Sequence, residues 1–223
     1  MEAWVAGATG LVGRALVVEL SSRLSSGNVT ALVRRAEGKK LPRLEERVVA
    51  YERLELELAG TSATHAFCCL GTTIAKAGSQ EAFRRVDFDY PLAFGRAARA
   101  AGARRFSIVT ALGADPKSSI FYNRVKGEVE QALAELGFPE LHVFRPSLIL
   151  GERAERRPAE RLAMTLARPV GALLLGPLKK YRAIEGTVIA RAMVNVALAP
   201  SPGAAVNVYE SDRIASLGEV ASR

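Results

Sequence analysis

The 223-residue sequence contains only two cysteines and two histidines. Cys68 and Cys69 are adjacent in an apolar run, and neighbours on a strand point to opposite faces, so they are poor disulfide partners. We expect both to be small buried side chains of a protein in a reducing compartment. His65 and His142 have no carboxylates or thiols at ligand spacing, and we therefore predict no metal site.

Long apolar runs are also missing from the sequence. The longest candidates, 141–150 and 170–175, fall short of the roughly 18 apolar residues that a membrane span requires. Residues 1–4 lead directly into a strand pattern without a basic leader. We therefore expect a cytoplasmic protein with no membrane partner.

The net charge is +8, and arginine supplies most of the basic residues. Basic pairs occur at 34–35, 39–40, 104–105 and 156–157, but only 6% of residues are aromatic and none interleaves with a basic stripe. This pattern argues against a dedicated nucleic-acid surface. A positive field would still attract an anionic cofactor. A homo-oligomer or a protein partner is left open.

Apolar runs of strand length alternate with helical patterns, as is typical of βαβ units. The expected strands are 4–6, 29–33, 48–51, 66–70, 106–110 and 141–144, and the expected helices are 11–20, 81–101 and 120–136. After residue 151 the alternation weakens, with helices near 157–167 and 187–198 and a strand at 205–209. We predict one α/β domain, a Rossmann-like doubly wound parallel sheet with helices on both faces. Its core is 1–150, and the segment 151–223 covers the substrate end of the sheet, where such folds bind ligands.

A glycine-rich run joins the first strand to the first helix. It reads Gly7-Ala8-Thr9-Gly10-Leu11-Val12-Gly13. Gly7 permits a tight turn, Gly10 lets backbone N–H groups approach a pyrophosphate, and Gly13 allows close packing of helix on strand. The helix N-terminus adds partial positive charge. The run predicts a dinucleotide site that includes Thr9, Leu11 and Val12.

The second strand ends in Arg34 and Arg35, where an enzyme that prefers NAD would normally have an acidic residue. Arginine forms bidentate hydrogen bonds with phosphate, so this pair favours NADP(H) over NAD(H). The alternative is a solvated loop with two incidental arginines. Further cofactor candidates follow later strands, and these are Leu70, Gly71, Thr72 and Pro146.

Tyr122 and Lys126 are four residues apart at the start of a predicted helix, which places them on one face. An ammonium group stabilises a neighbouring phenolate, so such a pair can protonate a carbonyl oxygen as hydride arrives from a nicotinamide. Thr110, at the end of the fifth strand, is the preferred third hydroxyl, with Ser118 and Ser119 as competitors. Asp87 could brace this helix, although a solvated position on a helix face is the commoner interpretation.

These motifs resemble the short-chain dehydrogenase/reductase superfamily. Further segments resemble its atypical, Tat-interacting oxidoreductase-like branch. They are 67–73 (FCCLGTT), 85–90 (RVDFDY), 113–115 (GAD), 126–130 (KGEVE), 144–146 (FRP) and 191–193 (RAM). The resemblance implies a Rossmann-like fold, NADP(H), and a catalytic set of serine or threonine with tyrosine and lysine. One departure is Ala111, at a position where the superfamily often has a second serine.

The leading hypothesis is an NADPH-dependent reductase of a small carbonyl substrate. A cofactor-sensing interaction module with little chemistry is the alternative, because Ala111 puts the catalytic hydroxyl in doubt. A nucleotide-sugar epimerase or dehydratase ranks lower, because such enzymes usually need a larger C-terminal substrate region.

Overall fold

The computed structural model describes residues 1–151, 176–201 and 203–219. Its main sheet has seven parallel strands in the order β3-β2-β1-β4-β5-β6-β9. The strands are β1 Glu2–Ala6, β2 Asn28–Val33, β3 Leu44–Val48, β4 His65–Cys68, β5 Arg105–Val109, β6 Glu140–Arg145 and β9 Val206–Glu210. The order reverses between β1 and β4, and open parallel sheets bind ligands at the carboxyl ends of the strands at such a point. The predicted Rossmann-like sheet is confirmed.

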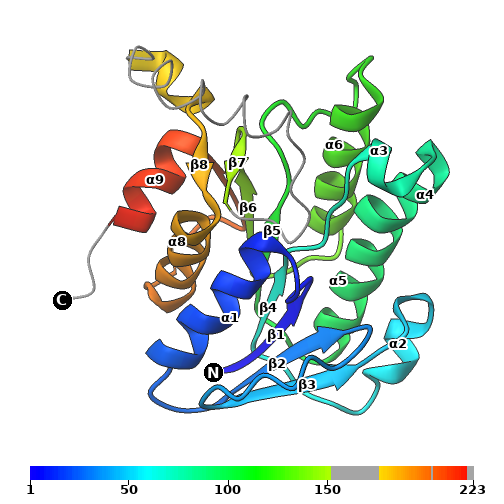
Figure 1. Cartoon of the computed structure of the whole chain (residues 1–223), viewed down its shortest axis with the longest axis vertical. Helices are drawn as coiled ribbons and strands as arrows, with labels where there is room; N and C mark the ends of the chain where they lie inside the picture. The colour runs from blue at the N-terminus through cyan, green and yellow to red at the C-terminus, as the bar shows by residue number, and fades with distance from the viewer. Residues whose placement is uncertain (152–175, 202, 220–223) are drawn as a thin grey trace.

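Helices cover both faces of the sheet, as Figure 1 shows. They are α1 Leu11–Arg23, α2 Leu54–Glu57, α3 Ile74–Ala77, α4 Gln80–Arg84, α5 Tyr90–Ala100, α6 Phe121–Ala134, α8 Gly186–Leu198 and α9 Ser211–Glu219. Alternate residues of β1 supply the two cores: Val5 packs with α1, α8 and α9, whereas Trp4 packs with α2, α5 and α6. Cys68 and Cys69 are free thiols that contribute to opposite cores, as their adjacency predicts.

The described part of the C-terminal segment is built into this architecture. Strand β9 extends the main sheet beside β6, and α8 packs on α1. Arg105 fastens the end of α8 by donating to the carbonyl oxygens of Ala197 and Ala199 at 2.7 and 2.8 Å. Two short strands, β7 Ile149–Leu150 and β8 Ile184–Glu185, form a separate parallel pair.

Three expectations about the elements need correction. The third strand is Leu44–Val48, not 48–51, because its polar edge sequence hides the pattern and Tyr51 begins a 3₁₀ turn, η1 Tyr51–Arg53. The expected helix 81–101 is divided by a π-helical turn, η2 Arg85–Asp89. Residues 70 and 110 lie just beyond β4 and β5. The expected helix at 157–167 lies outside the described residues.

Candidate dinucleotide and catalytic site

The glycine-rich loop turns sharply between β1 and α1. Gly7 has φ +78°, and a Cβ there would lie 2.5 Å from the carbonyl carbon of Cys69. A Cβ on Gly13 would lie 2.1 Å from the carbonyl oxygen of Gly7, so the helix packs directly on the loop. Gly10, the N-cap of α1, has no side-chain cap. The first N–H groups of the helix are therefore offered by bare backbone, which fits a pyrophosphate.

The remaining loop residues divide between the surface and the core. Thr9 is exposed, and its carbonyl oxygen accepts from Arg14 Nε at 2.8 Å. Val12 is buried, and the Leu11 side chain lies against Gly186, where a Cβ would come within 3.0 Å of Leu11 Cγ. Thus Leu11 and Val12 support the loop by packing, whereas Thr9 and Gly10 face outward.

Tyr51, which was not predicted from the sequence, supports the glycine-rich loop through hydrogen bonds. Its hydroxyl accepts from the Gly7 N–H at 3.4 Å and donates to the Leu32 carbonyl oxygen at 3.0 Å. Burial, the largest influence, raises the pKa of Tyr51 to about 12, so the hydroxyl remains a donor at neutral pH. The ring of Tyr90 lies 5.4 Å from that of Tyr51. The only sequence signal for this support was an aromatic residue after the weak third strand.

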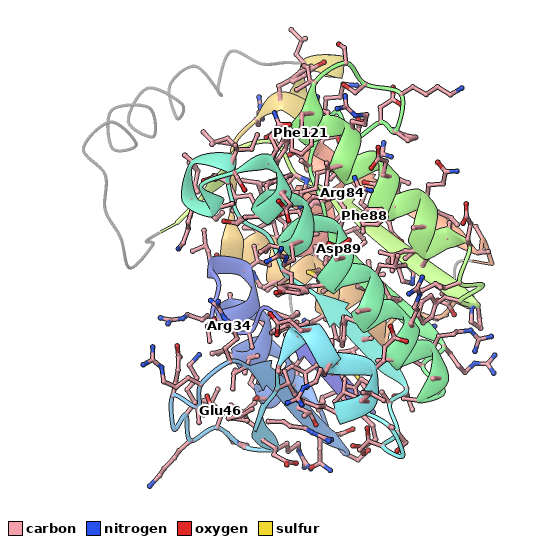
Figure 2. All side chains as sticks on the ribbon, turned by 90° about the vertical axis from the view of Figure 1, so that its right-hand side faces the viewer. Arg34, Glu46, Arg84, Phe88, Asp89 and Phe121 are labelled. Atoms are coloured by element: carbon pink, nitrogen blue, oxygen red, sulfur yellow. The ribbon has the colours of Figure 1, made fainter. Side chains whose placement is uncertain are left out.

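Arg34 and Arg35 follow β2, the strand that pairs with β1, and both are exposed. Figure 2 shows Arg34 beside the blue ribbon of the N-terminal residues. Within the described residues neither arginine has an ion pair or a side-chain hydrogen bond. Arg14, on the first turn of α1, reaches the same region, and its Nη2 lies 3.0 Å from Glu37 Oε1. The structure therefore adds a third guanidinium group, which the sequence reasoning did not select.

The end of β4 meets a buried ion pair. Thr72 donates its N–H to Asp87 Oδ2 at 2.9 Å, and Asp87 Oδ1 lies 2.7 Å from Lys126 Nζ. The Asp87 and Lys126 side chains are 0% and 5% exposed. Gly71 lies beside this pair, because a Cβ there would be in ordinary van der Waals contact with it, 3.5 Å from Asp87 Oδ1 and 3.7 Å from Lys126 Nζ. Leu70 is half-buried and packs on the core beneath.

The interpretation of Asp87 as a solvated residue is wrong. The π-helical turn η2 points Asp87 into the protein while Asp89 stays exposed. Turns of this kind occur frequently at functional sites. Its partner Lys126 is subject to opposing influences: burial acts to lower the pKa, but attraction to Asp87 and then to Tyr122 raises it overall. Lys126 is therefore held as an ammonium group.

Helix α6 carries Tyr122 one turn before Lys126. Tyr122 packs on Phe83 of α4, with the ring centroids 5.4 Å apart. Gly127 fixes the helix against the preceding loop, because a Cβ there would lie 2.2 Å from the carbonyl carbon of Asp115. The predicted tyrosine–lysine face is thus positioned between η2 and the end of β4.

The Thr110 hydroxyl is already engaged by another residue of α6. Thr110 is 5% exposed, and its hydroxyl donates to Glu130 Oε1 at 2.6 Å, a carboxylate that Arg145 holds from β6 through Nε at 3.1 Å. Its hydroxyl therefore has a structural acceptor two turns along α6 from Tyr122. Ala111 is buried and has no hydroxyl to offer.

The competing serines lie on the loop before α6. Ser118 is half-buried, and its Oγ accepts from the Ile120 N–H at 3.1 Å, whereas Ser119 is exposed. Pro146 is buried, and its carbonyl oxygen accepts from the Leu112 N–H at 2.8 Å, joining the ends of β5 and β6. Of the three hydroxyl candidates, Ser118 is the one with a fixed oxygen and no described acceptor for its own proton.

Two kinds of feature are missing from the described residues. None of their helices has both the length and the apolar character needed to cross a bilayer. Nor do they contain a group of three histidine, cysteine, aspartate or glutamate residues that could hold a metal ion.

The fold and the loop define a dinucleotide-binding protein, and comparison with known proteins agrees. A family profile described as NAD(P)H-binding matches residues 7–137. The chain is 37% identical to protein HTATIP2 of Rattus norvegicus over 97% of its own length and 88% of the relative's. It is also 43% identical to the mitochondrial protein fmp52 of Emericella nidulans, over 58% of this chain and 55% of that protein.

The chain belongs to the NAD(P)H-binding, atypical short-chain dehydrogenase/reductase family, in the branch that includes HTATIP2 and the FMP52 proteins. Solved structures share its fold. MoeE5 in complex with UDP-glucuronic acid and NAD matches with a TM-score of 0.70 at 17% identity, covering 94% of this chain and 76% of that one. The human epimerase family protein SDR39U1 with NADPH matches with a TM-score of 0.59 at 17% identity, covering 89% and 70%.

The prediction of a cytoplasmic location is contradicted. Fungal relatives that are 32–43% identical to this chain are named as mitochondrial proteins. Composition and fold could not decide this point, because receptors read address signals that are separate from the folded core.

Proposed function

We propose that this protein is an NADP(H)-dependent reductase of a small carbonyl compound. The observation that carries the proposal is the buried Lys126–Asp87 pair beside Gly71, with Tyr122 one turn earlier on α6. Such a constellation lies at the carboxyl end of β4, next to the glycine-rich loop, where open α/β sheets bind dinucleotides.

The nicotinamide dinucleotide would supply hydride when bound. The backbone N–H groups after Gly10 would hold its pyrophosphate, and Lys126 would donate to the hydroxyls of the nicotinamide ribose. Tyr122 would donate its phenolic proton to the carbonyl oxygen, with the Lys126 ammonium stabilising the phenolate that this step leaves. Asp87 keeps that ammonium charged and fixed in a buried position.

The structure favours Ser118 over Thr110 as the hydroxyl that accompanies Tyr122. Thr110 already donates to Glu130, and moving its proton to a substrate would leave that carboxylate without one of its donors. Ser118 keeps its proton free within the described residues, four positions before Tyr122. We accordingly propose Ser118, Tyr122 and Lys126 as the working set.

A preference for NADP(H) is part of the proposal. Arg34 and Arg35 are exposed and form no ion pair within the described residues, so both guanidinium groups can bind a 2′-phosphate. The NADPH bound to SDR39U1 is consistent with this preference, although the MoeE5 structures hold NAD.

The test compares wild type with Tyr122→Phe in NADPH oxidation against a panel of small aldehydes and ketones. Loss of the phenolic proton should lower kcat by about 10²-fold or more, with little change in NADPH affinity measured by calorimetry. Tyr181→Phe, which alters an exposed tyrosine on the 3₁₀ turn η3 Gly176–Tyr181, is the matched control. Equal turnover by wild type and Tyr122→Phe would remove the tyrosine from the mechanism.

A second candidate is a module that binds NADPH and signals its presence with little chemistry. The specific observation is that Thr110 is committed to Glu130 while Ala111 has no hydroxyl. This candidate gains if NADPH binds tightly while no carbonyl compound in the panel is reduced, and it fails if turnover is robust.

A further inference from the structure

The loop after β2, which begins with Arg34 and Arg35, places a carboxylate between two further cations. Glu37 Oε1 lies 3.0 Å from Arg14 Nη2, and Glu37 Oε2 lies 3.1 Å from Lys39 Nζ. Arg14 also donates from Nε to the carbonyl oxygen of Thr9 in the glycine-rich loop at 2.8 Å. The Arg14 guanidinium group therefore connects the glycine-rich loop with Glu37.

We propose that Glu37 is a specificity-determining residue that competes with a ribose 2′-phosphate for Arg14 and Lys39. This inference rests on the proposed NADP(H) function and adds a residue that opposes binding of the 2′-phosphate. Arg34 and Arg35 attract the 2′-phosphate, whereas Glu37 neutralises two further cations and repels a second anion. The balance between these groups sets how strongly the protein distinguishes NADP from NAD.

The contacts of Glu37 are suited to displacement. The side chains of Arg14, Glu37 and Lys39 are 51%, 32% and 29% exposed, and exposed ion pairs contribute little stability. An incoming phosphate can therefore take over both cations at small cost.

The backbone at Glu37 is held independently of its side chain. Glu46 Oε2, from β3, accepts from the N–H groups of Glu37 and Gly38 at 3.0 and 2.8 Å. Figure 2 shows Glu46 and Arg34 on the same side of the molecule, where β3 and β2 form one edge of the sheet. A change at the Glu37 side chain should leave this anchor, and thus the loop, in place.

The test is calorimetric titration of NADP⁺ and of NAD⁺ into wild type, Glu37→Gln and Glu45→Gln. Glu45 is an exposed glutamate on β3 that has no described ion pair, so Glu45→Gln makes the same change in net charge away from Arg14 and Lys39. Removing the competing charge should lower the Kd for NADP⁺ about threefold to tenfold in Glu37→Gln and leave the Kd for NAD⁺ within about twofold. Glu45→Gln should change neither value, and the gain should shrink at high salt.

The possible outcomes separate this inference from the function on which it rests. An unchanged NADP⁺ affinity in Glu37→Gln, or an equal gain in Glu45→Gln, overturns the competition. Weaker NAD⁺ binding in Glu37→Gln overturns it as well, because Glu37 would then be an acceptor for the ribose 2′-hydroxyl. If wild type binds neither nucleotide, the proposed function itself fails.

Discussion

The buried Lys126–Asp87 pair permits a quantitative prediction about stability. Asp87→Asn keeps the shape of the side chain and an oxygen that can accept from the Thr72 N–H, but it replaces the negative oxygen opposite Lys126 Nζ with an uncharged amide NH2 group. Both side chains are almost fully buried and the charged atoms are 2.7 Å apart. Removing one partner of such a pair leaves an uncompensated charge and costs about 3–5 kcal/mol, a large share of the stability of a typical domain.

The pH dependence of this variant identifies the cause of the loss. In wild type the pKa of Lys126 is raised, so its contribution is fully present below the unfolded-state value of about 10.4 and is lost only as pH rises through the folded-state value. Without Asp87, burial dominates and lowers the pKa of Lys126. The unfolded state then binds the extra proton, and the stability deficit of Asp87→Asn should narrow as pH rises from 7 to 9.

Urea unfolding at pH 7, 8 and 9 measures both effects, with Asp89→Asn as the matched control on the same π-helical turn. Asp89 is exposed, so its substitution should change the free energy of unfolding by no more than about 0.5 kcal/mol. If Asp87→Asn costs less than about 1 kcal/mol and its deficit does not vary with pH, the pair is not the buried, mutually dependent contact described above.

Two further changes test other parts of the structure. Gly13→Ala should lower the free energy of unfolding by about 1–3 kcal/mol and weaken NADP⁺ binding, because its Cβ would lie 2.1 Å from the Gly7 carbonyl oxygen. In Gly10→Ala the closest approach is 3.3 Å, so urea unfolding should show a smaller loss of stability. Equal stability of the two variants would contradict the close packing of α1 on the loop. Burial, followed by the charge of Arg105, lowers the pKa of His65 to about 4, so its stability contribution is present above the unfolded-state value of about 6.5 and is lost as pH falls through 4. The free energy of unfolding of His65→Gln should therefore fall less than that of wild type between pH 6.5 and 5. An equal fall in both proteins, measured by urea unfolding, would refute this.

The features that the sequence predicted depend on short-range patterns. The glycine-rich loop, the apolar strands and the spacing of Tyr122 and Lys126 are all contained in a few consecutive residues, and the structure brings the ends of β1, β4 and β5 to one edge of the sheet. The arginines after β2 could likewise be selected because β2 was recognisable.

The features that the sequence did not predict depend on contacts between distant residues. Asp87 is buried because a π-helical turn rotates it toward Lys126, and no local pattern distinguishes that turn from an ordinary helix. The direction of the Thr110 hydroxyl is set by Glu130, which in turn is placed by Arg145. The sequence places the third strand several residues too late, because Glu45 and Arg47 give β3 the polarity of a loop.

The packing of α8 on α1 has a consequence for the order in which the chain can acquire its structure. Leu16 and Leu20 of α1 share a core with Ile189 and Met193 of α8, which are synthesised long after them. Helix α1 therefore lacks this apolar cover until α8 has emerged from the ribosome. A nascent chain that stalls after β6 would present that uncovered face to chaperones instead of a finished nucleotide-binding half.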